Sequence, residues 1–184
     1  DVGASVKKDY NPLISNIMNL PKPVICAVNG VAAGAGASIA LACDIVLAAR
    51  SASFIQVFCK IGLVPDSGGT WNLPRAVGLA RAKGLALLGD RLPAETAESW
   101  GLIWKCVDDE SLQDEAMSMA SHLATQPTAA LGRIKKLLHQ SESNRLSEQL
   151  DLEQKAMQEL GQSNDYREGV AAFLEKRSPV FKGH

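Results

Sequence analysis

The chain is organised around residues 23–66, PVICAVNGVAAGAGASIALACDIVLAARSASFIQVFCKIGLVPD. The run Val24–Val28 is short, apolar and rich in β-branched residues, and it gives way to glycine and alanine before an apolar run begins at Ile39. This order is typical of a strand, a tight loop and a helix. Because Gly and Ala leave the backbone N–H groups open and a helix N-terminus carries a partial positive charge, the loop predicts a site for an anion or an oxyanion.

The segments around this loop predict an α/β fold. Residues 44–49 and 53–57 have the composition and length of further strands, and strand, helix and strand at this spacing favour parallel pairing with a crossover helix. A last strand is expected at 102–107, after a short helix that ends near Pro74 and further helices. We predict a core over residues 1–110 and an all-helical region over 111–184, with helical spacing also at 10–20 and a loose polar segment at 1–9.

Composition limits the possible partners. The chain has 184 residues, 46% of them hydrophobic and 21% charged, with a formal net charge of −1, so nothing favours nucleic acid or an acidic membrane surface as a partner. The one long apolar region is interrupted by Asn29 and Asp44 and fits poorly as a membrane span. The four cysteines are irregularly spaced and resemble core residues more than metal ligands or a disulfide framework, which favours a reducing, cytoplasmic setting.

Other chemistries for the glycine-rich loop fit poorly. After Gly34–Gly36, Ile39 stands where a dinucleotide-binding fingerprint needs glycine, and the chain has no Gly-Lys-Ser or Gly-Lys-Thr of a phosphate loop. The three histidines all lie in the predicted helical region and no Gly-x-Ser-x-Gly elbow occurs, which argues against a Ser-His-Asp hydrolase. No cluster has the spacing of metal ligands, so no metal is expected.

Asp66 is the candidate catalytic group. It follows Pro65 and precedes two glycines, so a cap on the following helix is one interpretation and a general base beside the amide-lined loop is another. A base that removes a carbon-bound proton gains basicity from apolar surroundings. We expect those surroundings from Phe54, Val57, Phe58, Leu63 and Val64.

Together these residues resemble the crotonase superfamily, the enoyl-CoA hydratase/isomerase family. The family's central signature is matched in order and spacing by residues 21–30 (PKPVICAVNG), 33–36 (AGAG) and 42–45 (ACDI), and its later pattern by residues 62–66, 68–70, 73–75, 89–91 and 172–177. The resemblance covers nearly the whole chain from about Leu20. It implies a crotonase-like spiral of ββα turns with a C-terminal helical trimerisation region. It also implies acyl-CoA substrates, a homotrimer or dimer of trimers, and no cofactor beyond the coenzyme A of the substrate.

The resemblance also implies roles for individual residues. The family's second oxyanion-hole amide falls on Ala35, after Gly34, where glycine is usual. The two catalytic glutamates of the hydratases fall on Ser38 and Phe58, so simple hydration is disfavoured. Asp66 lies where the family's isomerases place a carboxylate base.

Further positions are expected to bind the substrate. Gly34, Phe58 and Val64 are among the residues expected to contact the substrate. Phe173 and Lys176 match the C-terminal pair that contacts the adenine and phosphate end of coenzyme A, usually from a neighbouring subunit.

The closest resemblance within the family is to its phenylacetate-degradation branch, carried by residues 23–37 and 178–183. This implies conversion of 1,2-epoxyphenylacetyl-CoA to oxepin-CoA, and a shift of β,γ-enoyl-CoA to α,β-enoyl-CoA. The family's first oxyanion amide comes from a loop upstream of the segment where this chain begins, so we expect that loop and the early ββα turns to lie outside this sequence. A broad enoyl-CoA hydratase and a catalytically silent CoA-binding subunit remain as alternatives.

Overall fold

The computed structural model describes all 184 residues, which form two compact units. The first unit comprises Asp1–Met18 and Val24–Met117, and the second comprises Asn19–Pro23 and Ser118–His184. The predicted division into domains at residues 110 and 111 stays a prediction. None of the helices has both the length and the apolar character that a membrane crossing requires.

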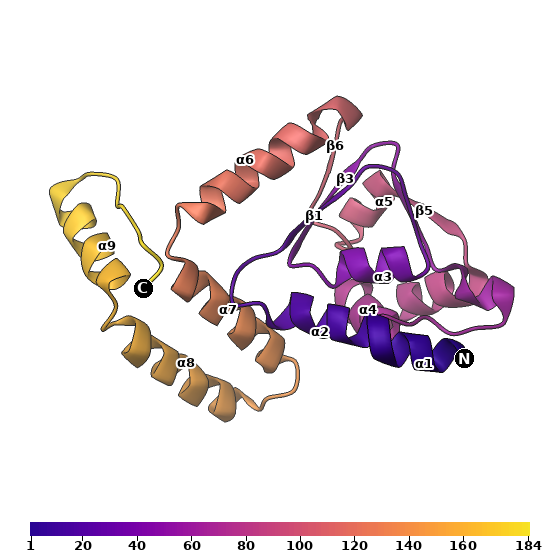
Figure 1. Cartoon of the computed structure of the whole chain (residues 1–184), viewed down its shortest axis with the longest axis horizontal. Coiled ribbons are helices and arrows are strands. Elements are labelled where there is room, and N and C mark those ends of the chain that lie inside the picture. The colour runs from indigo at the N-terminus through magenta and orange to yellow at the C-terminus, as the bar shows by residue number, and fades with distance from the viewer. The chain divides into compact units, whose positions relative to one another are not determined.

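Two small sheets build the first unit, and the chain passes from one to the other in successive turns (Figure 1). One sheet has the order β1-β3-β6, with all strands parallel, and the other has the order β2-β4-β5, with β2 parallel and β5 antiparallel to β4. The strands are β1 (Ile25–Val28), β2 (Val31–Ala33), β3 (Ile45–Ala49), β4 (Ser53–Ile55), β5 (Arg91–Pro93) and β6 (Lys105–Val107).

Helices follow the strand pairs and complete the predicted spiral. β1 and β2 lead into α3 (Ala35–Leu41), and β3 and β4 lead through the 3-10 helix η2 (Val57–Ile61) into α4 (Gly69–Leu88). β5 is followed by α5 (Ala94–Ser99), and β6 by the 3-10 helix η3 (Asp109–Ser111). The repeated order of two strands and a helix confirms the expected ββα architecture.

The central strand β3 explains why the sequence predicted parallel pairing. Its register places Ile45 opposite Ile25 of β1 and Leu47 opposite Lys105 of β6. Leu47 and Ala48 have no exposed surface. Parallel strands are covered on both faces and therefore have continuous apolar sequences, as residues 45–49 do.

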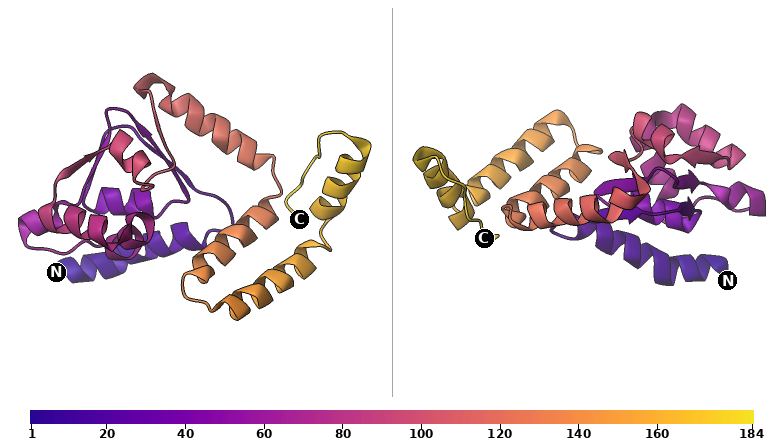
Figure 2. Two further views of the ribbon diagram at one scale, coloured as in Figure 1. Left: turned by 180° about the vertical axis from the view of Figure 1, so that it is seen from behind. Right: turned by 90° about the horizontal axis from the view of Figure 1, so that it is seen from above.

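Two short strands and the N-terminal segment differ from expectation. β2 and β5 were not predicted, because three residues carry too little pattern and their strand conformation comes from pairing with β4. The expectation of a loose segment at 1–9 is wrong: α1 (Val2–Ser5), the π-helix η1 (Val6–Tyr10) and α2 (Asn11–Asn19) form one helical rod (Figure 2). The carboxylate of Asp1 accepts a hydrogen bond from the Gly3 N–H at 2.9 Å and so caps its start.

The sequence predicted that the helix after Asp66 ends near Pro74, but helix α4 continues past this residue. Pro74 lies inside the helix, and the backbone leaves helical geometry only at Gly78, with φ 77° and ψ 162°. Proline removes one helical hydrogen bond without forcing a break, whereas the positive φ of the actual kink favours glycine.

Helices alone build the second unit, as predicted for the C-terminal region. They are the C-terminal part of α6 (Leu112–Ala124), then α7 (Thr128–Ser141), α8 (Leu146–Leu160) and α9 (Asn164–Glu175). α7 and α8 pack side by side as a hairpin (Figure 1). Gly132 of α7 lies so close to the preceding segment that a Cβ would be 2.4 Å from the Pro21 carbonyl oxygen, so only glycine fits there.

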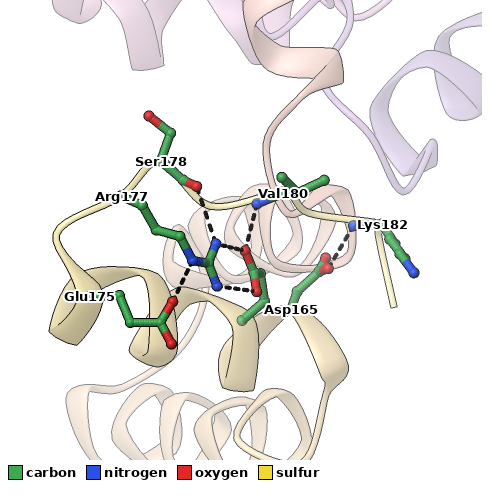
Figure 3. A network of polar contacts seen from close by, with 7 residues as sticks. Asp165, Glu175, Arg177, Ser178, Val180 and Lys182 are labelled. Carbon is green, nitrogen blue, oxygen red and sulfur yellow. Dashed lines mark hydrogen bonds and ion pairs between the residues drawn. The ribbon is translucent and has the colours of Figure 1, made fainter.

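The C-terminal tail folds back on α9 through charged side chains (Figure 3). Arg177 donates to both carboxylate oxygens of Glu168, at 2.6 and 3.0 Å, and the Val180 N–H donates to the same carboxylate at 2.8 Å. Asp165 accepts a hydrogen bond from the Lys182 N–H at 2.7 Å. The hydrogen bonds from Arg177 and Val180 lower the pKa of Glu168 from 4.5 to about 2.

Candidate active site

The glycine–alanine turn before α3 has a conformation that only glycine adopts readily. Gly34 has φ 54° and ψ −124°, and its N–H donates to the Ile55 carbonyl oxygen at 2.9 Å. Its own carbonyl oxygen accepts a hydrogen bond from the Ser38 N–H at 3.1 Å. These two bonds attach the turn to β4 and to α3, and so fix the direction of the first N–H groups of the helix.

Ala35 is the first residue of α3 and is half-buried. The strained φ falls one residue earlier, on Gly34, and Ala35 is not among the residues with positive φ. The methyl group of alanine is therefore accepted where the family usually has glycine. The Ala35 N–H has no intrahelical acceptor, because the first N–H groups of a helix point out of its end.

Asp66 precedes an unusual turn and is half-buried. Ser67 and Gly68 both have positive φ, 50° and 77°, and the Gly69 N–H closes the turn on the Asp66 carbonyl oxygen at 2.8 Å. The N-cap of α4 is Gly68, and no side chain caps the helix, so the interpretation of Asp66 as a helix cap is wrong. Asp66 Oδ1 is buried and has no hydrogen-bond partner in the chain.

The apolar residues expected around Asp66 separate into two groups. Phe54 and Phe58 are buried, and the Phe58 ring lies beside Gly34, with Cζ 3.6 Å from the position that a Cβ of Gly34 would take. Leu63 and Val64 are instead 43% and 76% exposed. The structure therefore brings Gly34 and Phe58 together behind the turn and leaves Val64 open to solvent.

Sequence reasoning missed most of the buried polar side chains near Asp66. In addition to Asp66 Oδ1, four buried side-chain atoms have no hydrogen-bond partner: Ser38 Oγ, Gln56 Oε1, Ser67 Oγ and Asn72 Nδ2. They lie on α3 (Ser38), just before η2 (Gln56), in the turn that enters α4 (Ser67) and in the first turn of α4 (Asn72). Buried polar atoms are normally hydrogen-bonded, so their concentration in one region marks it as more than a packing feature.

The expected coenzyme A residues lie in the second unit. Phe173 of α9 is 82% exposed, and Lys176 ends the helix in the left-handed conformation with φ 54°. Beside them an apolar cavity of about 730 Å³ is lined by residues that include Met157, Tyr166, Phe173, Leu174 and Phe181.

Cysteine and acidic side chains give no metal site. No group of three His, Cys, Asp or Glu side chains could hold a metal ion, and no disulfide joins the cysteines. Cys26 of β1 and Cys43 are hydrogen-bonded, and this bond lowers the pKa of the Cys26 thiol although partial burial acts in the opposite direction.

Comparisons with known proteins agree with this architecture. The profile of the family described as Enoyl-CoA hydratase/isomerase matches residues 2–184. The chain is 61% identical over 183 residues to the 1,2-epoxyphenylacetyl-CoA isomerase of Escherichia coli (strain K12), with 100% of this chain and 70% of the relative covered. It is 53% identical over 178 residues to a protein of Rhodobacter capsulatus named "Probable enoyl-CoA hydratase", covering 97% of this chain and 69% of that protein.

A solved structure shares the fold. The crystal structure of an enoyl-CoA hydratase from Bacillus anthracis superposes with a TM-score of 0.94 at 34% identity, and 100% of this chain and 70% of that chain are covered. The ββα spiral, the profile match and these relatives together show that the chain belongs to the enoyl-CoA hydratase/isomerase family.

Proposed function

We propose that the protein is an acyl-CoA isomerase in which Asp66 is the base and the Ala35 N–H is an oxyanion donor. The observation that carries this proposal is the carboxylate of Asp66, which is half-buried, makes no capping bond and has a buried oxygen without a partner. A carboxylate oxygen without a hydrogen bond inside the chain is available to a proton of the substrate.

The proposed reaction moves one proton between two carbon atoms of the thioester. Asp66 removes a proton from the α-carbon, and the electron pair moves toward the thioester oxygen, which accepts a hydrogen bond from the Ala35 N–H. The protonated Asp66 then returns the proton to another carbon, so substrate and product have the same composition. In a β,γ-enoyl-CoA this return occurs at the γ-carbon and gives the α,β-enoyl-CoA. In 1,2-epoxyphenylacetyl-CoA the bond between the two epoxide carbons also breaks and its electron pair joins the ring double bonds, so the proton returns to a carbon of the enlarged oxepin ring and no atom is lost.

These two groups account for large factors in rate. A positioned acid–base group contributes about 10²- to 10⁴-fold, and removal of one oxyanion donor costs about 10²- to 10³-fold. Both estimates make Asp66 and the amide turn the parts of the chain with the greatest expected influence on turnover.

We propose 1,2-epoxyphenylacetyl-CoA as the substrate, with oxepin-CoA as the product, and β,γ-enoyl-CoA esters as further substrates. The support is the 61% identity to the Escherichia coli isomerase. Gly34, Phe58 and Val64 would line the acyl site. The exposed Phe173 and Lys176 would contact the adenine and phosphate end of coenzyme A.

We also propose a homotrimer or dimer of trimers formed through the C-terminal helices. The large exposed side chains of α8 and α9 support this assembly, since Leu146, Met157, Phe173 and Leu174 are each more than 70% exposed. The last three of these also line the apolar cavity. The thiol state of all four cysteines supports a cytoplasmic setting.

A broad enoyl-CoA hydratase is the second candidate, favoured by the 53% identity to the Rhodobacter protein. Against it, Ser38 and Phe58 occupy the positions where the resemblance places the two hydratase glutamates, and both side chains are buried and cannot transfer protons as carboxylates do.

The deciding experiment is a turnover assay of the purified full-length protein with three substrates. We expect rearrangement of 1,2-epoxyphenylacetyl-CoA and of a β,γ-enoyl-CoA, and little addition of water to crotonyl-CoA. Hydration of crotonyl-CoA as the fastest of the three reactions would replace the isomerase proposal by the hydratase. Binding of all three thioesters without turnover would favour the silent CoA-binding subunit.

A further inference from the structure

Gly69 is the point where α3 meets the turn that carries Asp66. A Cβ on Gly69 would lie 2.7 Å from Ser38 Oγ, 3.1 Å from Pro65 Cβ and 3.7 Å from Gln56 Oε1. One glycine is thus surrounded by the hydroxyl of Ser38, the side-chain oxygen of Gln56 and the ring of Pro65, the residue before Asp66.

Ser38 and Gln56 present complementary polar atoms at this point. A serine hydroxyl can donate a hydrogen bond, and the Oε1 of glutamine can only accept one. Ser38 is 0% and Gln56 3% exposed, and neither Ser38 Oγ nor Gln56 Oε1 has a partner in the chain. These two buried groups could satisfy each other and lie near the same glycine without a hydrogen bond, so a small movement of the turn can bring them together.

The two segments that meet at Gly69 also carry the two groups of the proposed reaction. Ser38 is three residues beyond Ala35 on α3, which is almost one helical turn. Gly69 is three residues beyond Asp66 and is hydrogen-bonded to it through the backbone at 2.8 Å. A movement of the hydroxyl against Gly69 therefore acts on both segments that carry these two groups.

We propose that Ser38 is a positioning residue, whose hydroxyl, packed against Gly69, sets the distance between the oxyanion donor and the base. The inference rests on the proposed function. Because Ser38 has no exposed surface, it acts without touching the substrate. Its loss therefore lowers kcat and leaves KM for the thioester unchanged.

The first test replaces Ser38 and compares it with another buried serine. In Ser38→Ala we expect kcat to fall at least tenfold with KM within twofold of the wild type. The control is Ser53→Ala: Ser53 is 1% exposed and its Oγ accepts a hydrogen bond from Arg91 Nε at 2.8 Å, so this change also removes a buried hydroxyl. We expect Ser53→Ala to lower the melting temperature and leave kcat unchanged. Equal kcat in the two variants would overturn the proposal.

A second pair of variants distinguishes a positioning role of the Ser38 hydroxyl from the space that it fills. Gly69→Ala forces a methyl group against Ser38 Oγ, and the double variant Ser38→Ala/Gly69→Ala removes that conflict. If Ser38 only fills space, the double variant regains kcat. We expect the double variant to regain stability relative to Gly69→Ala while kcat stays at least tenfold below the wild type.

Hydrogen exchange tests the inference independently of turnover. In Ser38→Ala we expect the Gly69 amide, which closes the turn on Asp66, to exchange at least tenfold faster, with no such change in Ser53→Ala. An unchanged rate at Gly69 overturns the inference whatever the activity. If the wild type rearranges no thioester, the proposed function fails, and the exchange rate at Gly69 alone decides whether Ser38 holds the turn.

Discussion

Two glycines at the start of α3 should respond in opposite directions to the same substitution. Gly34 and Gly36 are two residues apart, yet only Gly34 has a positive φ. We predict that Gly34→Ala destabilises the first unit and that Gly36→Ala stabilises it. The pair tests the backbone geometry that directs the Ala35 N–H.

The magnitudes follow from what an added Cβ would meet. At Gly34 the nearest atoms would be Val57 Cγ2 at 3.4 Å and Phe58 Cζ at 3.6 Å, which are ordinary contacts, so the cost comes from the backbone and not from a clash. A residue with a side chain in such a sparsely populated conformation costs about 1–3 kcal/mol. At Gly36 a Cβ would meet nothing within 4 Å, and alanine in a helix is more stable than glycine by up to about 1 kcal/mol.

Urea unfolding followed by tryptophan fluorescence measures the change in free energy of unfolding of the first unit, which contains both glycines. The three tryptophans, Trp71, Trp100 and Trp104, all lie in the first unit, so their emission does not report on the second. We expect Gly34→Ala to lower the free energy of unfolding by about 1–3 kcal/mol, equivalent to roughly 2–4 °C in Tm per kcal/mol for a chain of this size.

Activity provides a second reading of the same variant. If the turn relaxes toward a common conformation instead of keeping its strain, the Ala35 N–H rotates and kcat falls by about 10²- to 10³-fold, the usual cost of a lost oxyanion donor. A Gly34→Ala variant with wild-type stability and wild-type kcat would refute the geometry of the turn. A loss of stability in Gly36→Ala as large as that in Gly34→Ala would do the same.

Two further predictions concern ionisation. The pKa of Glu168 is lowered in the folded chain to about 2, so the stability that this carboxylate gives the tail is complete above the ordinary value of 4.5 and is lost as pH falls toward 2. Protection of the Val180 amide from hydrogen exchange should therefore decrease between these pH values, and should be low at every pH in Glu168→Gln. Constant protection in the wild type would contradict this prediction. The hydrogen bond to Cys43 lowers the pKa of the Cys26 thiol, so Cys43→Ala should raise that pKa. Alkylation of Cys26 by iodoacetamide near pH 8, measured by peptide mass spectrometry, should then be slower than in the wild type. An unchanged rate would show that the bond is not formed.

The sequence predicted the parts of the fold that have their own pattern. Residues 24–28 and 44–49 were recognised as strands because buried parallel strands are continuously apolar. β2 and β5 were missed because each has three residues and depends on β4 as a partner. The helical start of the chain was missed because its polar composition gave no apolar face, while the cap by Asp1 is visible only in three dimensions.

The candidate site was predictable only where one residue carries the chemistry. Asp66 was selected from the sequence as a carboxylate before a glycine pair, and Ala35 from the resemblance to the family, and their catalytic roles stay predictions. Ser38 and Gln56 could not be assigned to the surroundings of Asp66, because they come together only when α3, the start of η2 and the entry to α4 pack around Gly69. Adjacent glycines flanked by polar residues are the one signal that could have indicated this close approach.

The central claim is that Asp66 removes a proton from the α-carbon of a CoA thioester, and a substrate deuterated at that carbon measures this step directly. The full-length protein should convert 3-hexenoyl-CoA with two deuterons on the α-carbon to 2-hexenoyl-CoA with one, and Asp66→Asn should slow this loss by about 10²- to 10⁴-fold while the dissociation constant for the thioester, from calorimetry, stays within a few-fold. Loss of the α-deuteron in Asp66→Asn at the wild-type rate would contradict the assignment of Asp66 as the base.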